Sequence, residues 1–90
     1  MKVFFKKSFL KDFQKLPKEI KSEIKDICFC IFPEIKNLLE FKTHPLKKLR
    51  GFKNYYRIKV KDFRVGLKKA NGEVIFMKAL HRKDIYRHFP

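Results

Sequence analysis

Hydrophobic residues recur at helical spacing in the first part of the chain. Phe9, Phe13 and Leu16 follow Ser8, whose hydroxyl can cap a helix. These positions predict a first helix that comes after a short strand at residues 1–5.

Four isoleucines predict a second helix. Their spacings of four, three and four positions put them on one helix face, and they are Ile20, Ile24, Ile27 and Ile31. Pro17 breaks the first helix or opens the second, and Pro33 ends or kinks the second. The two helices are expected to form an antiparallel hairpin, whereas residues 34–45 could prolong the second helix or line a loop.

From Leu46 the hydrophobic period changes to two, which is typical of half-buried strands. Two such strands are predicted, with Tyr56, Ile58, Val60, Phe63, Val65 and Leu67 inward and Arg57, Lys59, Lys61, Arg64, Gly66 and Lys68 outward. Lys61–Asp62 is a turn candidate, and Asn71–Gly72 is the strongest hairpin signal. Residues 74–80 follow as a more apolar and therefore more central strand.

The last segment, residues 81–89, is expected to form a short helix because Ile85 and Phe89 are spaced to dock one face. The predicted fold is α+β. An N-terminal helix hairpin packs on a curved, mostly antiparallel sheet of four to five strands, followed by the short C-terminal helix. Ninety residues fit one domain, so we expect a single domain over residues 1–90.

Composition narrows the location and the cofactor chemistry. No stretch approaches the roughly 18–20 apolar residues that a membrane span needs, and the N-terminal apolar run is too short for a signal peptide. We therefore expect a cytoplasmic protein. Cys28 and Cys30 point to different sides of a helix and lack ligand partners at zinc-finger spacing, so we expect neither a disulfide nor a metal site.

The charge of the chain is its strongest compositional signal. Lys and Arg number 24 against 9 Asp and Glu, which gives a net charge of +15. Such an excess favours a polyanionic partner, because like charges repel in the folded protein. Nucleic acid is the first candidate, an anionic membrane surface the second, and an acidic protein the third, which does not exclude the first.

Candidate chemistry lies on the outward face of the predicted strands. Adjacent antiparallel strands would bring Arg57, Lys59 and Arg64 within reach of one small anion, and a scissile phosphate is the natural occupant. A solvated basic surface would carry the same residues. Gly66 within a strand indicates either a close approach by a ligand or backbone, or a bend.

The terminal segment adds residues suited to RNA chemistry. His81 can act as an acid or a base, Arg82 can bind phosphate bidentately, and Tyr86 can stack on an unpaired base. Each also has an ordinary structural explanation, as a capping histidine, a solvated arginine and a tyrosine at the core edge. His44 and His88 lie in a loop and near the terminus, where a catalytic role is not expected.

Four runs of the chain together resemble the RelE branch of the RelE/ParE toxins. They are residues 7–17, 46–60, 63–67 and 81–86, in family-like order and spacing across essentially the whole chain. The resemblance implies the toxin of a type II toxin–antitoxin pair. It would be a metal-independent endoribonuclease without a cofactor that cuts mRNA, often on the ribosome, by attack of the RNA 2′-hydroxyl. It also implies an acidic antitoxin that wraps the toxin.

The resemblance implies a role for each candidate residue. Lys59 matches a residue proposed as general base, and Arg64 matches a phosphate-binding arginine. Arg82 matches an arginine proposed to stabilise or protonate the leaving group. Tyr86 matches a base-stacking tyrosine, and His81 resembles histidines that share the acid–base work. Arg57 stands where relatives often carry a catalytic lysine, and an arginine hardly accepts a proton. RNA binding is therefore assigned to Arg57, Lys68, Lys48 and Lys53.

Two other functions fit the same features. A ParE-like toxin would inhibit DNA gyrase on this fold without nuclease chemistry. A non-enzymatic basic module would bind RNA and leave it intact. The basic strand pair and the His81–Tyr86 segment favour the nuclease.

Overall fold

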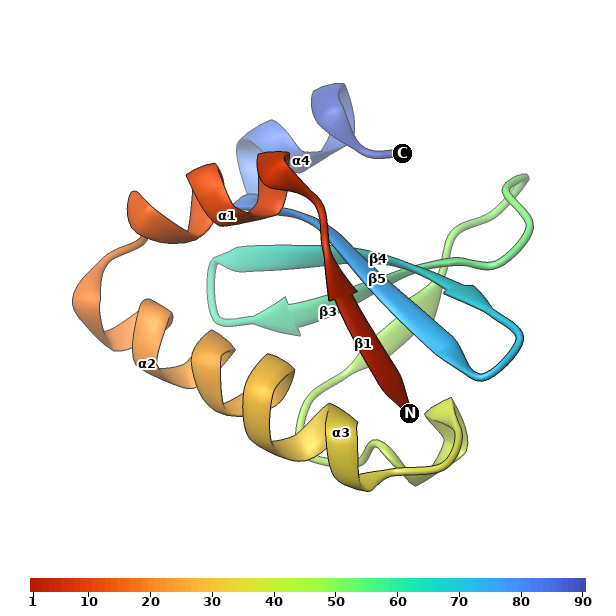
Figure 1. Cartoon of the computed structure of the whole chain (residues 1–90). Coiled ribbons are helices and arrows are strands. Elements are labelled where there is room, and N and C mark those ends of the chain that lie inside the picture. Colours follow the sequence, from red (N-terminus) through yellow and green to blue (C-terminus); the bar gives the residue numbers. More distant parts are fainter.

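A five-stranded sheet forms the centre of the computed structural model, which describes residues 1–90 (Figure 1). The strands are β1 Lys2–Phe5, β2 Leu46–Lys48, β3 Tyr55–Val60, β4 Phe63–Ala70 and β5 Glu73–His81, in the spatial order β1-β5-β4-β3-β2. The β1–β5 pair is parallel and the other three pairs are antiparallel. The predicted α+β class and mostly antiparallel sheet are thus confirmed, and β5 lies between two neighbours as expected.

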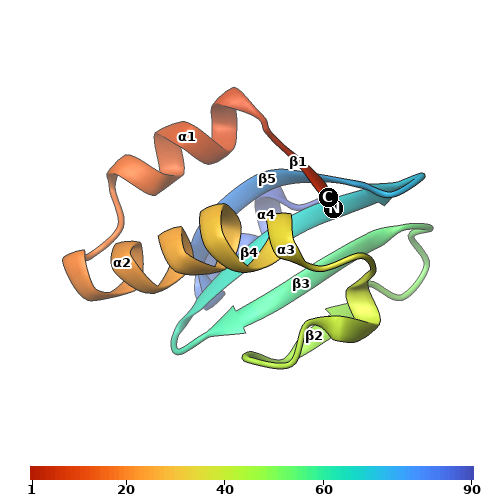
Figure 2. The ribbon, with the colours of Figure 1, turned by 60° about the horizontal axis from the view of Figure 1, so that its bottom comes forward.

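Helices cover both faces of this sheet. They are α1 Lys7–Gln14, α2 Lys18–Asp26, the three-residue α3 Phe32–Glu34 and α4 Arg82–His88, with a π-helical turn at Ile27–Ile31 and a 3₁₀ turn at Leu38–Glu40. Figure 2 shows α2 in front of the sheet, α1 beside its β1–β5 edge, and α4 behind it. None of the helices has the length and apolar character needed to cross a membrane.

The second helix departs from the predicted isoleucine stripe at its C-terminal end. Ile20, Ile24 and Ile27 are buried, but Ile31 is only partly buried and Phe32 takes the fully buried place. The cause is the π-helical turn, in which the Phe32 N–H donates to the carbonyl of Ile27, five residues earlier. This wider turn moves the inward face one position along the chain.

Two prolines mark the start of α2 and the end of the helical run. Pro17 precedes α2 as its N-cap and so opens that helix. Pro33 lies inside α3, and the helical run ends at Glu34 rather than before the proline. The segment after Glu34, residues 35–45, therefore forms a loop that contains only the 3₁₀ turn.

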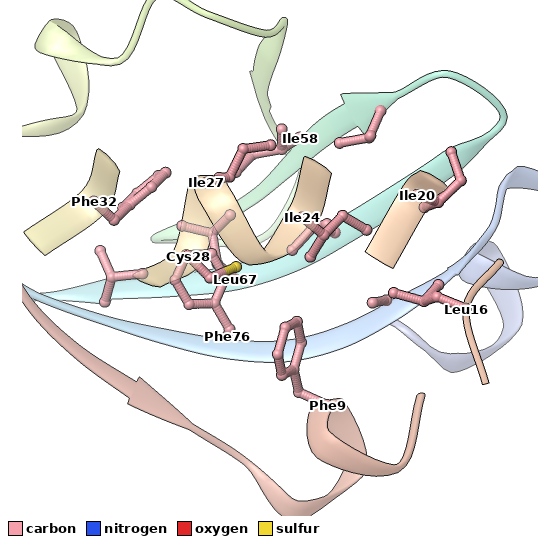
Figure 3. Close-up of a cluster of buried hydrophobic side chains, with 14 of the residues drawn as sticks. Phe9, Leu16, Ile20, Ile24, Ile27, Cys28, Phe32, Ile58, Leu67 and Phe76 are labelled. Atoms are coloured by element: carbon pink, nitrogen blue, oxygen red, sulfur yellow. The ribbon is translucent and has the colours of Figure 1, made fainter. Parts of the chain in front are cut away.

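Aromatic and aliphatic side chains from both layers fill the core between the helices and the sheet (Figure 3). Phe9 lies 5.8 Å from Phe76 of β5, and Phe32 meets the same ring edge-on at 5.1 Å, measured between ring centroids. Figure 3 shows Ile24 of α2 pointing into this cluster. The stability of the fold is therefore expected to depend on α2.

Ile24→Ala is expected to lower the free energy of unfolding by roughly 2–5 kcal/mol, because Ile24 is fully buried and its loss leaves a cavity. Leu39→Ala is the matched control, since Leu39 is 82% exposed and should change stability little. Urea denaturation of both variants measures the difference. A wild-type midpoint for Ile24→Ala would refute the assignment of α2 to the core.

Helix α1 completes the edge of β5 beyond the end of the short strand β1. The Ser8 hydroxyl donates to the carbonyl oxygen of Met77 at 2.6 Å, and an Asp12 carboxylate oxygen accepts from the Ala79 N–H at 3.0 Å. The prediction that Ser8 caps α1 is therefore wrong, because the helix begins at Lys7 and the Ser8 side chain is used by the sheet edge. Backbone groups of β5 that β1 is too short to reach are satisfied in this way.

The opposite face of the sheet is covered in part by the end of the chain. Ile85 and Phe89 are buried there, as their spacing predicted. Gly66 lies directly beneath Phe89, and a Cβ atom at Gly66 would come within 2.7 Å of the Phe89 ring. The group that approaches this glycine is a side chain of the protein itself, not the ligand or backbone that was expected, and the register between β4 and β5 also shifts between Gly66 and Leu67.

Candidate active site

The register of β3 and β4 brings the predicted basic residues onto one face. Lys59 pairs directly with Arg64, and Arg57 pairs with Gly66. Their neighbours Ile58 and Val65 point into the core. Because side chains alternate along a strand, Arg57, Lys59 and Arg64 all project from the opposite face, as predicted.

Lys59 and Arg64 differ in how they are held. The Arg64 guanidinium donates through Nη1 to the carbonyl oxygens of Lys61 and Phe63, both at 2.9 Å. Its other N–H groups stay free to bind an anion. Lys59 is exposed and takes part in none of the five salt bridges of the molecule. An arginine held by two hydrogen bonds thus stands beside a lysine without a salt-bridge partner.

Arg82 is attached to the same end of the sheet. Its backbone N–H donates to the carbonyl of Asp62 at 2.7 Å, and its Nε lies 3.9 Å from the Asp62 carboxylate. Asp62 belongs to the turn between β3 and β4, directly after the strand that carries Lys59. The start of α4 is therefore held at the turn that adjoins Lys59 and Arg64.

His81 serves as the N-cap of α4. Its Nδ1 accepts a hydrogen bond from the Lys83 N–H at 3.1 Å, and its ring meets Phe63 edge-on at 5.4 Å. Only Nε2 is left for a bound substrate. His81 therefore has the capping role, and any part in acid–base chemistry would have to use Nε2.

Tyr86 and Arg57 form a second part of the site. The Arg57 guanidinium carbon lies 4.7 Å from the centre of the Tyr86 ring, close enough for a cation–π interaction. Tyr86 nevertheless remains 67% exposed. Since Arg57 stands two residues from Lys59 on β3, the tyrosine ring lies beside the basic group rather than within it.

An open cleft of about 1080 Å³ extends from this pair. Its lining consists of residues 47–53, which belong to β2 and the β2–β3 loop, together with Arg57 of β3 and with Tyr86, Phe89 and Pro90 near the end of the chain. Two residues assigned to RNA binding, Lys48 and Lys53, line it together with Arg57 and Tyr86.

Lys68 lies apart from this cleft. Although it follows Gly66 on the same strand face, it pairs with Tyr55 and its Nζ stands 5.5 Å from the Tyr55 ring centre. It borders a separate hollow with Asn54 and Asn71. The structure therefore does not bring Lys68 together with the other candidates.

Three cleft residues were missed in the sequence. Lys47, Arg50 and Phe52 line the cleft, but period-two alternation assigns no role to a loop. A usable signal was present: Phe52 is an aromatic residue between cations and beside Gly51, outside any strand pattern.

No three His, Cys, Asp or Glu side chains gather closely enough to hold a metal ion. Both cysteines are free, and burial raises the pKa of the Cys28 thiol. His44 is engaged away from the site: its Nε2 lies 2.6 Å from Glu23, and its ring stacks on Phe41. His88 is exposed in the last turn of α4.

The Glu23–His44 contact predicts a pH dependence of stability. The hydrogen bond from His44, with the nearby charges of His44 and Lys61, lowers the pKa of Glu23 below 4.5. A carboxyl group with a depressed folded-state pKa stabilises the fold above its unfolded pKa, and this stabilisation is lost as the pH falls through the folded pKa. Denaturation between about pH 6 and pH 3 should show a shallower loss for Glu23→Gln than for the wild type. Parallel curves would show that the contact contributes nothing.

Comparison with known proteins identifies relatives along nearly the whole chain. A family model described as the ParE toxin of the type II toxin–antitoxin system parDE matches residues 3–86. Toxin RelE3 of Methanocaldococcus jannaschii is 41% identical over 93 residues, covering 100% of both chains.

Two solved structures show the same fold. A chain of the RelB–RelE antitoxin–toxin complex from Methanococcus jannaschii is 38% identical and has a TM-score of 0.77. The match covers 97% of this chain and 99% of that one. A chain of the intact E. coli RelBE complex is 18% identical with a TM-score of 0.67, covering 89% of this chain and 94% of that one. With a family model across residues 3–86 and an end-to-end match to RelE3, this chain belongs to the ParE toxin family of type II toxin–antitoxin systems, as a RelE-like toxin.

Proposed function

We propose that this RelE-like toxin is an endoribonuclease that cleaves mRNA by attack of a 2′-hydroxyl on the adjacent phosphate. One observation carries the proposal. Lys59 and Arg64 are paired across two strands, and Arg82 is held at the turn that joins these strands. Three cations at one end of a sheet suit a phosphate whose negative charge grows in the transition state.

The residues divide the chemistry between them. Lys59, which is exposed and makes no salt bridge, is the candidate to accept the proton of the 2′-hydroxyl in its uncharged amine form, as the hydroxyl oxygen bonds to phosphorus. It then carries the positive charge in the transition state. Arg64 binds the non-bridging phosphate oxygens. Arg82 stabilises the departing 5′-oxygen, which takes up a proton from water as the P–O bond breaks. The products are a 2′,3′-cyclic phosphate and a 5′-hydroxyl, and no metal or cofactor is assigned to the step.

Tyr86 is proposed to hold a base next to the scissile phosphate. Its exposed ring can stack on an unpaired base, and Arg57 supports the ring and adds a phosphate contact. Stacking would align the 2′-hydroxyl with the leaving oxygen, and this alignment lowers the barrier without further chemistry.

We further propose an acidic antitoxin as the protein partner, and mRNA, engaged on the ribosome, as the substrate. The relatives from Methanococcus jannaschii and E. coli were solved as complexes of RelE with RelB. A net charge of +15 suits a partner of opposite charge. The same charge suits RNA, so the antitoxin and the substrate are expected to compete.

Gyrase inhibition is the second candidate, because the matching family model is named for the ParE toxin. Two assays with purified toxin separate the candidates: cleavage of an mRNA under translation, and supercoiling by DNA gyrase. The proposal expects cleavage without an effect on supercoiling. Inhibited supercoiling with intact mRNA would establish the gyrase function instead, and RNA binding without either effect would leave a binding module.

RNA association should weaken steeply with salt, because each phosphate contact releases counterions. If about six contacts to a single strand form, affinity should fall roughly 300-fold between about 50 and 200 mM salt. Binding of an uncleavable RNA measured across a salt series gives the slope directly. A flat response would mean that the basic excess serves another partner.

A further inference from the structure

The cleft beside Tyr86 has a charge pattern that the catalytic group does not explain. Of its eleven lining residues none is acidic, and the five cations are Lys47, Lys48, Arg50, Lys53 and Arg57. The hollow beside α2, in contrast, has three acidic residues, Glu19, Glu23 and Asp26, and one cation, Lys25. The cleft is therefore suited to a polyanion over a length greater than one phosphate.

Phe52 makes this cleft more than a basic surface. The Phe52 side chain is 50% exposed and is part of neither the core nor the residues packed against it. It is held by an edge-to-face contact with Tyr55 at 6.3 Å, and Tyr55 in turn meets Phe89 at 5.7 Å. The loop itself is closed by the Leu49 N–H donating to the Tyr55 carbonyl at 2.8 Å.

Tyr86 is the other exposed aromatic residue that lines the cleft. Aromatic rings on a positively charged track are the usual means by which proteins hold unpaired nucleotides, because every base has a face that can stack. An acidic protein segment would be satisfied by the cations alone and gives no reason for Phe52. The aromatic pair therefore favours RNA over a protein as occupant.

We propose that Phe52 is a second base-stacking residue, and that the cleft binds the single-stranded RNA that flanks the scissile phosphate. The inference rests on the proposed nuclease function and names a subsite of it. Tyr86 would hold the base next to the cut, and Phe52 a base farther along the strand. Lys47, Arg50 and Lys53 would contact the phosphates near it.

The test is binding of the purified full chain to a single-stranded 2′-O-methyl RNA, which lacks the nucleophile and cannot be cut. A second oligomer has the same length and phosphates but lacks bases. Phe52→Ala should weaken binding of the RNA about tenfold, as expected for one lost stacking contact, and leave binding of the abasic oligomer unchanged. Phe52→Tyr should bind as the wild type does.

Phe4→Ala is the matched control, because Phe4 is also an exposed phenylalanine, 47% accessible, but lies on β1 outside the cleft. It should bind both oligomers normally. Equal melting temperatures of the two alanine variants would exclude a folding defect.

Two results would overturn the inference. Unchanged RNA binding by Phe52→Ala would show that no base stacks there. An equal loss for the RNA and the abasic oligomer would show a site for acidic surfaces in general. Either result can occur with a wild type that cleaves mRNA normally, so the nuclease proposal would survive. Conversely, selective loss of RNA binding in a toxin that never cuts RNA would refute only the nuclease.

Discussion

Arg82→Ala is expected to slow cleavage of bound RNA by a factor on the order of 10²–10³, the usual cost of removing one donor to a charged transition state. Its side chain is exposed and makes only a long 3.9 Å contact with Asp62, so its loss should change stability little. The backbone hydrogen bond from residue 82 to Asp62 remains in the variant, which keeps α4 in place. Single-turnover cleavage measures the effect apart from binding.

Arg87→Ala is the matched control for this change. Arg87 is an exposed arginine on the same helix, paired only with Asp84 at 3.3 Å. It removes the same charge from α4 without touching the proposed site, so its cleavage rate should stay near that of the wild type. If Arg82→Ala and Arg87→Ala slowed cleavage equally, the charge of α4 would matter and the position of Arg82 would not; a wild-type rate for Arg82→Ala would remove it from the site.

Tyr86→Ala is expected to reduce cleavage at least tenfold, because a stacked base is held by about 1–3 kcal/mol and also aligns the reacting hydroxyl. Tyr86→Phe should be mild, since its ring can still lie over Arg57 and beneath a base. Tyr86 is mostly exposed, so neither change should disturb the fold. Cleavage rates at saturating RNA separate alignment from affinity.

A severe loss in Tyr86→Phe would contradict the stacking role and assign the chemistry to the phenol hydroxyl. A wild-type rate in Tyr86→Ala would remove the tyrosine from the site altogether. Together with the Arg82 series, these variants distinguish the residues that act on the phosphate from those that orient the base.

Local patterns predicted the sheet because they depend on neighbouring residues. Asn71 and Gly72 both have positive φ, 47° and 79°, as the tight hairpin expected for this pair requires. Alternation likewise predicted that Arg57, Lys59 and Arg64 share a face. Each of these depends on backbone conformation within a few residues.

The errors arose where distant parts of the chain meet. The π-helical turn buries Phe32 in place of Ile31, and no local pattern in the sequence marks this turn. Ser8 has the residue type of a helix cap, but its hydroxyl donates to the Met77 carbonyl beyond the end of β1. The Ser8 contact joins distant parts of the chain and overrides a local preference.

The sequence predicted the placement of the site residues that lie on strands, but not of those whose position depends on a loop or on the C-terminal helix. The strand residues were found by their period. The attachment of Arg82 to Asp62 depends on where α4 begins, and the separation of Lys68 from the cleft depends on its place on β4 opposite Tyr55. Phe52 lies in a loop, where periodicity carries no information. The role proposed for Phe52 depends on its place in one cleft with Tyr86 and Phe89.

The most direct test of the account is to map the RNA ends that the purified toxin leaves in a single turnover, with wild type and a Lys59→Ala/Arg82→Ala double variant in parallel. Attack by the 2′-hydroxyl predicts a 2′,3′-cyclic phosphate or 3′-phosphate and a 5′-hydroxyl. Cutting should persist in EDTA wherever ribosomes are not required, and the double variant should leave RNA intact. Ends with a 5′-phosphate and a 3′-hydroxyl, or wild-type cutting by the double variant, would contradict it.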